Sequence, residues 1–416
     1  MKRKDVPILF DSAEMKTLME PLVNLEKLVV GFNRHSFSGL SVTPDDSDGL
    51  YWRWVGIMTS FLPRLIDLEL IHANVSKFID DVPNTLSKAS NLMRLSLAQT
   101  NKGTENRGFE DGRAAMQDRS NFVIGYHADG RPWGPYISKV VVDMGLISNL
   151  YPNLRHLELA IENHSKLEIS EETSLAHLLS LRLAGTNIRT ASNITDLIKC
   201  CPNLLALDLK SAFIPEEKVI PIMLSCLLIE MLDLSFAGFD CEILSVLASA
   251  AANLPQLKVL IMLGCVYPLT GTGVNIKFDR KSSLPGKEII LDLLQRFPCL
   301  VSLLGVNKSW IKVSDFTGTS LDFVGIGEQS HRTLLSYPAQ YRSTVKHSTY
   351  KLERTGRWSV LEEGTQDWHT AWGTRYICLP GSRLTSDLLR ITTTKRQHIN
   401  RVKGFSRFSR SGNKRP

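Results

Sequence analysis

The sequence predicts an α/β solenoid, in which short parallel strands stack into one curved sheet and helices lie on its convex side. Three observations predict this fold: a leucine pattern that recurs in phase, a proline that recurs just before it, and helical sequence in the intervals. The chain has 416 residues, of which 43% are hydrophobic and 22% charged. These are ordinary values for a globular chain, so most of it can bury a core.

The pattern LxxLxL, followed two residues later by a small or polar residue, recurs along the first 309 residues. The first positions of the units are Leu25, Leu65, Leu92, Leu154, Leu178, Leu204, Ile229, Leu257 and Leu300. Between 154 and 257, where no insertion intervenes, successive units begin 24 to 28 residues apart. This spacing is typical of leucine-rich repeats, whose units run to about 20 to 29 residues.

A proline stands two residues before the first leucine in five of the units. These prolines are Pro63, Pro152, Pro202, Pro255 and Pro298. Proline there ends the preceding helix, and we expect it to set an extended entry into the strand. Leucines at i, i+3 and i+5 point inward, and since one unit cannot bury them alone, the units must stack.

We expect the solenoid to span 1–309, with insertions near 34–62, 101–150 and 266–290. Insertions in solenoids emerge as loops on one face, often near the binding surface. The leucine pattern stops after about 310. The segment 310–389 is then expected to be irregular or to form short strands, and 390–416 to be a disordered basic tail.

The charge is concentrated at one end of the chain. The whole chain carries a net charge of +7, and the tail 390–416 holds nine Lys or Arg and no Asp or Glu. A solvated tail with no specific partner is one interpretation, and contact with nucleic acid or an import receptor is another. No stretch is long and apolar enough to span a membrane or to act as a signal peptide, so we expect a cytoplasmic or nuclear protein.

The outward-facing strand positions are the candidate binding site. Side chains alternate along a strand, so the residue between the second and third leucines faces the concave surface. This surface is charged in its first half and turns apolar in its second. The predicted partner-binding residues are Glu69, Glu158, Arg182, Asp208, Met231, Asp233, Phe236, Val259 and Ile261. Exposed apolar residues there need a partner or a cover. In the alternative to partner binding, the insertion at 266–290 or the chain after 310 folds over them.

No motif indicates catalysis, a cofactor or a metal. The sequence has no phosphate loop, nucleophile elbow or zinc-ligand spacing, and its seven cysteines form no CxxC pair. Cys200, Cys201, Cys226 and Cys299 fall just before strands, so we interpret them as core residues. A non-enzymatic interaction module is therefore expected, and an enzyme with a site in 310–389 is the alternative from a different class.

The segment from Ile194 to Leu209, ITDLIKCCPNLLALDL, resembles the cysteine-containing repeats of F-box leucine-rich-repeat proteins, especially the fungal ones. The resemblance covers roughly 15–309 in pattern and is best at 178–265. Members of that family are often substrate receptors of cullin-based ubiquitin ligases, so the resemblance implies a protein substrate and a ligase adaptor as partners. The 24 residues before the first repeat do not read as an F-box, and a box-less scaffold is the alternative.

Overall fold

The structure is a computed structural model of the chain. It describes residues 17, 19–31, 55–71, 89–98, 141–160, 166–183, 194–209, 221–222, 225–235, 242–262, 269–270, 277–278, 287–307, 311–328, 345–353 and 355–366. All of these lie in the first of the two units of the chain, Met1–Thr370. Phe236, the tail 390–416 and most of the three predicted insertions lie outside the described residues.

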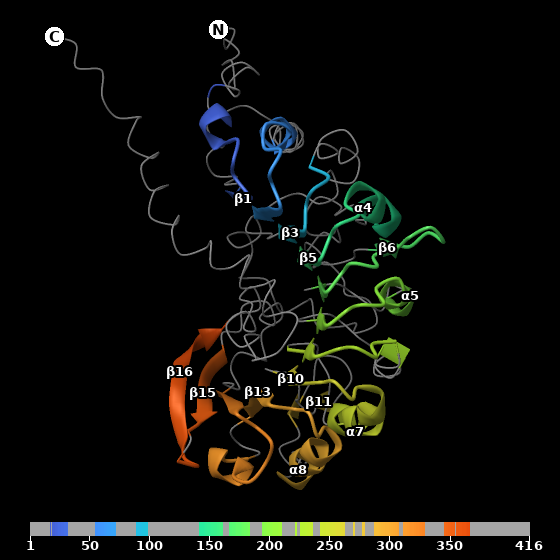
Figure 1. Cartoon of the computed structure of the whole chain (residues 1–416). Coiled ribbons are helices and arrows are strands. Elements are labelled where there is room, and N and C mark those ends of the chain that lie inside the picture. The colour runs from blue at the N-terminus through green and yellow to red at the C-terminus, as the bar shows by residue number, and fades with distance from the viewer. Residues whose placement is uncertain are drawn as a thin grey trace, which may run out of the picture. The chain divides into compact units, whose positions relative to one another are not determined.

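One twelve-stranded sheet organises the described chain, and its strand order follows the chain order (Figure 1). All neighbouring strands from the first to β14 are parallel. The strands are β1 (Lys27–Gly31), β2 (Asp67–Ile71), β3 (Arg94–Ala98), β5 (His156–Ala160), β7 (Ser180–Arg182), β8 (Ala206–Asp208), β9 (Met231–Asp233), β10 (Val259–Ile261), β13 (Ser302–Asn307), β14 (Phe323–Glu328), β15 (Val345–Leu352) and β16 (Trp358–Gln366). One strand per repeat, joined in parallel, is the arrangement that a leucine-rich-repeat solenoid requires.

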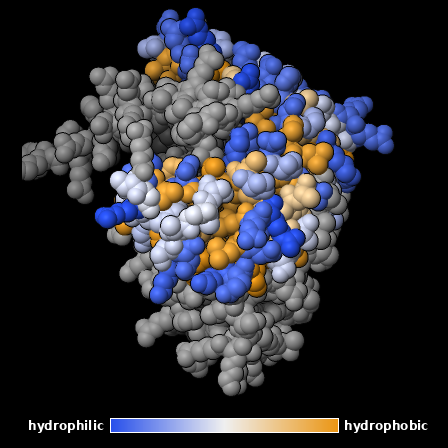
Figure 2. All heavy atoms as spheres, turned by 60° about the horizontal axis from the view of Figure 1, so that its bottom comes forward, coloured by the Kyte–Doolittle hydropathy of each residue, from blue (hydrophilic) through white to orange (hydrophobic). Residues whose placement is uncertain are grey.

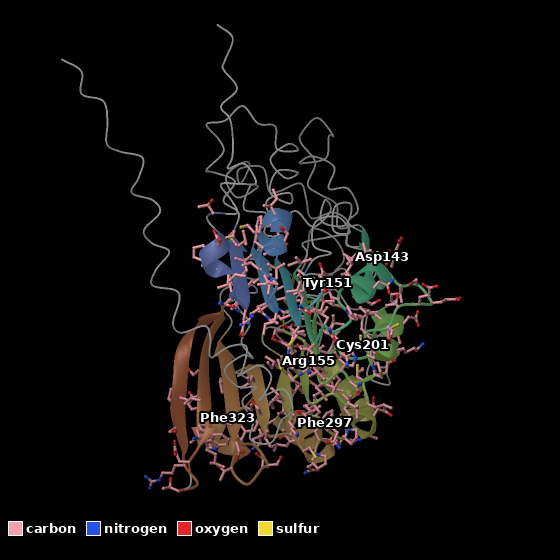
Figure 3. All side chains as sticks on the ribbon, turned by 45° about the horizontal axis from the view of Figure 1, so that its top comes forward. Asp143, Tyr151, Arg155, Cys201, Phe297 and Phe323 are labelled. Atoms are coloured by element: carbon pink, nitrogen blue, oxygen red, sulfur yellow. The ribbon has the colours of Figure 1, made fainter. Side chains whose placement is uncertain are left out.

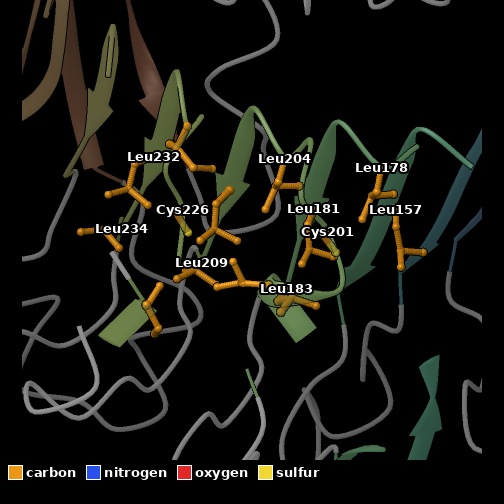
Figure 4. Close-up of a cluster of buried hydrophobic side chains, with 14 of the residues drawn as sticks. Leu157, Leu178, Leu181, Leu183, Cys201, Leu204, Leu209, Cys226, Leu232 and Leu234 are labelled. Carbon is orange, nitrogen blue, oxygen red and sulfur yellow. The ribbon is translucent and has the colours of Figure 1, made fainter. Parts of the chain in front are cut away.

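The register of the sheet keeps the repeats in phase. The second leucines of the units lie directly opposite one another, in the row Leu28, Leu68, Leu95, Leu157, Leu181, Leu207, Leu232, Leu260 and Leu303. From Leu68 onward these side chains are at most 1% exposed, and Figure 4 shows the inner leucines of neighbouring repeats packed on one another. The sequence prediction of an α/β leucine-rich-repeat solenoid is confirmed at this level.

Helices lie on the leucine side of the sheet (Figure 1). The α-helices with full bounds among the described residues are α4 (Met144–Leu150), α5 (Ile194–Lys199), α7 (Glu242–Ala250) and α8 (Lys287–Arg296), and residues 55–60 are also helical. Their inward residues, such as Ile147, Leu197 and Leu293, share one hydrophobic core with the strand leucines. Asp143 begins α4 by accepting a 3.0 Å hydrogen bond from the Leu146 amide, which satisfies a helix N–H that has no partner within the helix. None of the described helices is long and apolar enough to cross a membrane.

A tight turn precedes each repeat strand, and the recurrent proline lies inside it. The amide of Leu65 donates to the Leu62 carbonyl at 3.0 Å, and Leu204 donates to Cys201 at 3.1 Å in the same way. The proline is thus the second residue of a hydrogen-bonded turn that precedes the strand, and the extended entry stays a prediction. The fixed φ of proline suits this turn position, which explains its recurrence.

In the described repeats after the first, the residue that begins the turn is buried. Tyr151, Cys201 and Phe297 occupy this position in three repeats and are labelled in Figure 3. Cys226 occupies it in a fourth, and both it and Cys201 are buried, as the core interpretation predicted. Cys299 is the third residue of its turn and is exposed, so that interpretation is wrong for Cys299.

The sheet changes direction at its C-terminal end. β15 pairs antiparallel with β14, and β16 pairs antiparallel with β15. The register between β13 and β14 shifts beside Gly305, whose φ of 85° is readily adopted only by glycine. The described part of 310–389 therefore contains regular strands that extend the sheet. Figure 2 shows the end of the molecule that is lowest in Figure 1. Apolar side chains lie among polar ones on this surface.

Two short strand pairs and three 3-10 turns are also described. β4 (Val141–Asp143) pairs in parallel with β6 (Lys166–Glu168), and β11 (Leu269–Thr270) pairs antiparallel with β12 (Lys277–Phe278). Single 3-10 turns occur at η1 (Glu20–Leu22), η4 (Ala251–Asn253) and η5 (Val313–Phe316).

Candidate functional site

The predicted binding residues fall on one face of the sheet, which we call the outer face because its side chains point away from the leucine core. The parallel register places most of them in one row: Val29, Glu69, Ser96, Glu158, Arg182, Asp208, Asp233, Ile261 and Leu304. A second row on the same face runs through Lys27, Asp67, Arg94, His156 and Met231 among others. Every predicted site residue that the structure describes belongs to one of these two rows.

Seven charged side chains of the outer face are linked by ion pairs, and we call them the strand-face network. Its members are Lys27, Asp67, Glu69, Arg94, Glu158, Arg182 and Asp208. They come from six strands that are consecutive in the sheet, β1 to β8. The sequence-predicted residues Glu69, Glu158, Arg182 and Asp208 are thus brought together, because residues far apart in sequence share one position of the repeat.

Arg94 is the centre of the first half of the network. Its Nη1 lies 2.8 Å from Oδ1 of Asp67 and 3.6 Å from a carboxylate oxygen of Glu69, while its Nη2 lies 3.4 Å from Glu158. Lys27 pairs with the same Asp67 from the other side. Arg94 can reach the row of the two glutamates because the residue between them is Ser96, whose side chain is small.

Arg182 is the centre of the second half. It lies in the register directly between Glu158 and Asp208, pairing with the Glu158 carboxylate and holding Asp208 through Nε at 2.9 Å. Glu158 therefore joins the two halves, since both arginines contact it. Each arginine stands on a strand whose two neighbours carry carboxylates, at the spacing of about 4.8 Å that separates paired strands.

Ion pairs of the network favour the charged forms of Glu158 and Arg94. Burial by itself would raise the pKa of the Glu158 carboxyl, but Arg182 and Arg94, with hydrogen bonds from Ser96 and Arg182, lower that pKa below its ordinary value. Burial likewise opposes the charge of Arg94, yet Asp67, Glu158 and Glu69 raise its pKa. Opposite charges at this distance favour ionisation on both sides.

The two glutamates are the most exposed members of the network. The Glu69 and Glu158 side chains are each 21% exposed, compared with 10% for Arg182 and 15% for Arg94. The members include three cations and four carboxylates, so the net charge is −1. The arginines and the glutamates both have partners within the chain, and the two glutamates keep the larger exposed fraction of their side chains.

The apolar half of the outer face is buried, which corrects the expectation of an exposed patch. Met231, Val259 and Ile261 are 5%, 2% and 0% exposed. Asp233 is also buried, and its Oδ1 accepts a 2.8 Å hydrogen bond from the Ser235 amide. The chain itself therefore covers these positions, which agrees with the alternative in which another segment folds over them. Their role in binding a partner stays a prediction, as does that of Phe236, which lies outside the described residues.

Lys27, Asp67 and Arg94 also lie on this face but are not among the binding residues predicted from the sequence. Their signal was the alternation of charge from one strand to the next at a single repeat position. Alternating signs across parallel strands indicate cross-strand ion pairs. Within the described residues, no three His, Cys, Asp or Glu side chains are placed to hold a metal ion.

Comparison with known proteins adds two distant likenesses. No protein-family model matches the sequence, and no curated protein does. A solved TLR13–ssRNA13 complex matches with 18% identity and a TM-score of 0.28, covering 58% of this chain and 36% of that one. An internalin (inlF) from Listeria monocytogenes matches with 14% identity and a TM-score of 0.21, covering 73% of this chain and 85% of that one. This chain thus spans only about a third of the TLR13 chain.

Proposed function

We propose that this chain is a non-enzymatic protein-interaction module that binds a basic segment of a partner protein through the strand-face network. The observation that carries the proposal is the unequal exposure within the network, where Glu69 and Glu158 are more exposed than the arginines they contact. Ion pairs with Arg94 and Arg182 hold both carboxylates in place before a ligand arrives, which lowers the entropy lost on binding.

A charge reversal at Glu69 tests the proposal with little risk to the fold. Glu69 contacts Arg94 at 3.6 Å, the longest ion pair of the network, and is partly exposed. We expect Glu69→Lys to weaken capture of basic peptides from a peptide array at least tenfold, which is about 1.4 kcal/mol. The matched control is Asp196→Lys on α5, an exposed carboxylate on the helix side of the sheet. Equal binding by both variants would contradict the proposal.

The pair Asp208 and Asp233 is a poorer choice for mutation. Asp233 is 1% exposed, and Asp208 is paired with Arg182 at 2.9 Å. Lysine at either position would leave buried like charges next to Arg182, and loss of binding would then reflect misfolding.

We further propose a more specific role as the substrate-recognition part of a cullin-type ubiquitin ligase. Its support is the resemblance of Ile194 to Leu209 to F-box leucine-rich-repeat proteins, a segment folded as α5, a turn and β8. The test is co-purification of the chain with the ligase adaptor from cells. Failure to co-purify would favour the box-less scaffold, and it would leave the interaction module itself standing.

The basic tail supports a different candidate, a nuclear factor that contacts nucleic acid or an import receptor. Its support is the composition of 390–416 alone, with nine basic and no acidic residues. Binding of this kind would weaken steeply with salt. Deletion of 390–416 should then abolish nuclear accumulation, and an unchanged cellular location would contradict this candidate.

A further inference from the structure

The two ends of the sheet differ in how well the leucine core is covered. In the first repeat, Leu25, Leu28 and Val30 are only partly buried. The corresponding residues of the second repeat, Leu65, Leu68 and Leu70, are 1%, 0% and 0% exposed. The inner face of a terminal repeat has a neighbour on one side only, and solenoids cover such ends with a cap or a partner.

Exposed apolar side chains also lie on β1 and just before it in the sequence. Leu22, Val23 and Val29 are 41%, 43% and 47% exposed, which is unusual for large hydrophobic residues of one short segment. Within the part of the chain that the structure describes, β1 has a paired strand on one side only, β2. Its other edge carries backbone N–H and C=O groups that can pair with a further strand.

We propose that a second copy of this chain occupies this edge, with β1 of one copy paired antiparallel to β1 of the other. A two-fold axis through such a pair places Val29 opposite Val29 of the other copy. Leu28 then faces Val30, and Lys27 faces Gly31, so no like charges meet. The interface uses the same patch on both copies and closes on itself, as the commonest protein dimers do.

The pairing would join the two leucine cores. Leu28 and Val30 lie on the core side of β1. The β1 strand of the second copy would therefore place its Val30 against Leu28 and its Leu28 against Val30. The five residues of β1, Lys-Leu-Val-Val-Gly, include two β-branched residues and suit a strand interior.

The opposite edge of the sheet is less suited to a second copy. The last strand, β16, contains Glu362 and Glu363 near its centre, and an antiparallel self-pairing there would bring glutamates of the two copies together. The register of β16 against β15 also shifts beside Leu361, and an irregularity of this kind in an edge strand discourages further pairing.

Sedimentation velocity of the full chain is the first test. We expect the wild type to sediment as a dimer of twice 46.6 kDa. Val29→Lys places two ammonium groups opposite each other at the two-fold axis and should give a monomer. The matched control is Val360→Lys, since Val360 is an exposed valine (53%) on the edge strand β16, and it should leave the dimer intact. A monomeric wild type, or a Val29→Lys variant that remains dimeric, would overturn the proposal.

Cross-linking tests the register separately from the strength of association. Val29→Cys should react with a short bis-maleimide to give a covalent dimer, because its two copies face each other, while Val360→Cys should not. The wild-type chain controls for its own exposed Cys299. Equal cross-linking of the two variants would mean that β1 is not the contact, even if the chain proves dimeric. Both valines are exposed, so neither substitution threatens the fold.

Discussion

The Nη1 atom of Arg94 on β3 lies 2.8 Å from the Oδ1 atom of Asp67 on β2, and Asp67 is 2% exposed. The same guanidinium reaches Glu158 on β5, so one side chain spans three neighbouring strands. In the sequence, Asp67 is 27 residues and Glu158 is 64 residues away from Arg94. Because Arg94 contacts carboxylates on both neighbouring strands, the charged side chains of the outer face depend on one another.

Replacement of Arg94 by methionine should destabilise the fold by about 3 kcal/mol, since it leaves a buried carboxylate at Asp67 with Lys27 as its remaining ion-pair partner. Urea unfolding followed by circular dichroism measures the change. The control is Lys199→Met, which breaks the exposed pair of Lys199 with Asp196 and should cost less than about 0.5 kcal/mol. Similar losses in the two variants would show that the network adds no more than a surface pair.

Stability should fall in acid partly through Glu158. Its pKa in the folded chain lies below the ordinary value of 4.5, because Arg182 and Arg94 outweigh the effect of burial. A carboxyl with a lowered folded pKa contributes stability above its unfolded pKa and loses it as pH falls through the folded pKa. The free energy of unfolding should therefore drop as pH is lowered from about 4.5.

The comparison of wild type with Glu158→Gln isolates this contribution. The variant cannot ionise at this position, so its unfolding free energy should depend less on pH in the acid range. Urea titrations at a series of pH values between neutral and acid measure both slopes. Identical slopes for the two chains would mean that Glu158 is not stabilised in its charged form.

Leu207 should be among the costliest core positions. It lies in the leucine row between Leu181 and Leu232 and is 0% exposed. Truncation to alanine removes buried methyl groups and leaves a cavity between two repeats, at a cost of about 2 to 5 kcal/mol. Leu227→Ala is the matched control, because Leu227 is 61% exposed and its loss should change stability by no more than about 0.5 kcal/mol. Thermal and urea unfolding of both variants check the difference.

Leu228→Asn should stabilise the chain. In two other repeats an asparagine holds this third turn position and donates to a carbonyl of the preceding turn: Asn91 to Pro63 at 3.2 Å, and Asn203 to Ala176 at 2.8 Å. The equivalent acceptor for residue 228 is the carbonyl of Pro202. One new hydrogen bond contributes about 0.5 to 1.5 kcal/mol.

A second variant, Leu228→Ala, separates the hydrogen bond from the removal of an exposed leucine. Leu228 is 44% exposed, so its truncation alone should have little effect. The midpoint of urea unfolding should rise for Leu228→Asn and not for Leu228→Ala. Equal midpoints would show that no bond to Pro202 forms.

The alignment of each strand with the strand of the next repeat could be predicted from the sequence, because the leucines must stay buried. A strand that slipped by one residue would turn its leucines to solvent, so the pattern itself determines the register. The rows through Leu207 and through Asp208 follow directly from aligning the units, and the strand pairing agrees with both. The hydrogen-bonded turn at the recurrent prolines, in contrast, was not predicted from the sequence.

The sequence by itself thus determined the solenoid, its strands and the composition of its outer face, since each depends on local periodicity. Only the tertiary structure decided that Arg94 reaches Asp67, Glu69 and Glu158, because that contact depends on side chains from three repeats and on the small Ser96 between the two glutamates. It also decided that Met231, Val259 and Ile261 are buried. Burial on a sheet face depends on what packs over it, and a repeat pattern carries no information about segments outside the repeat.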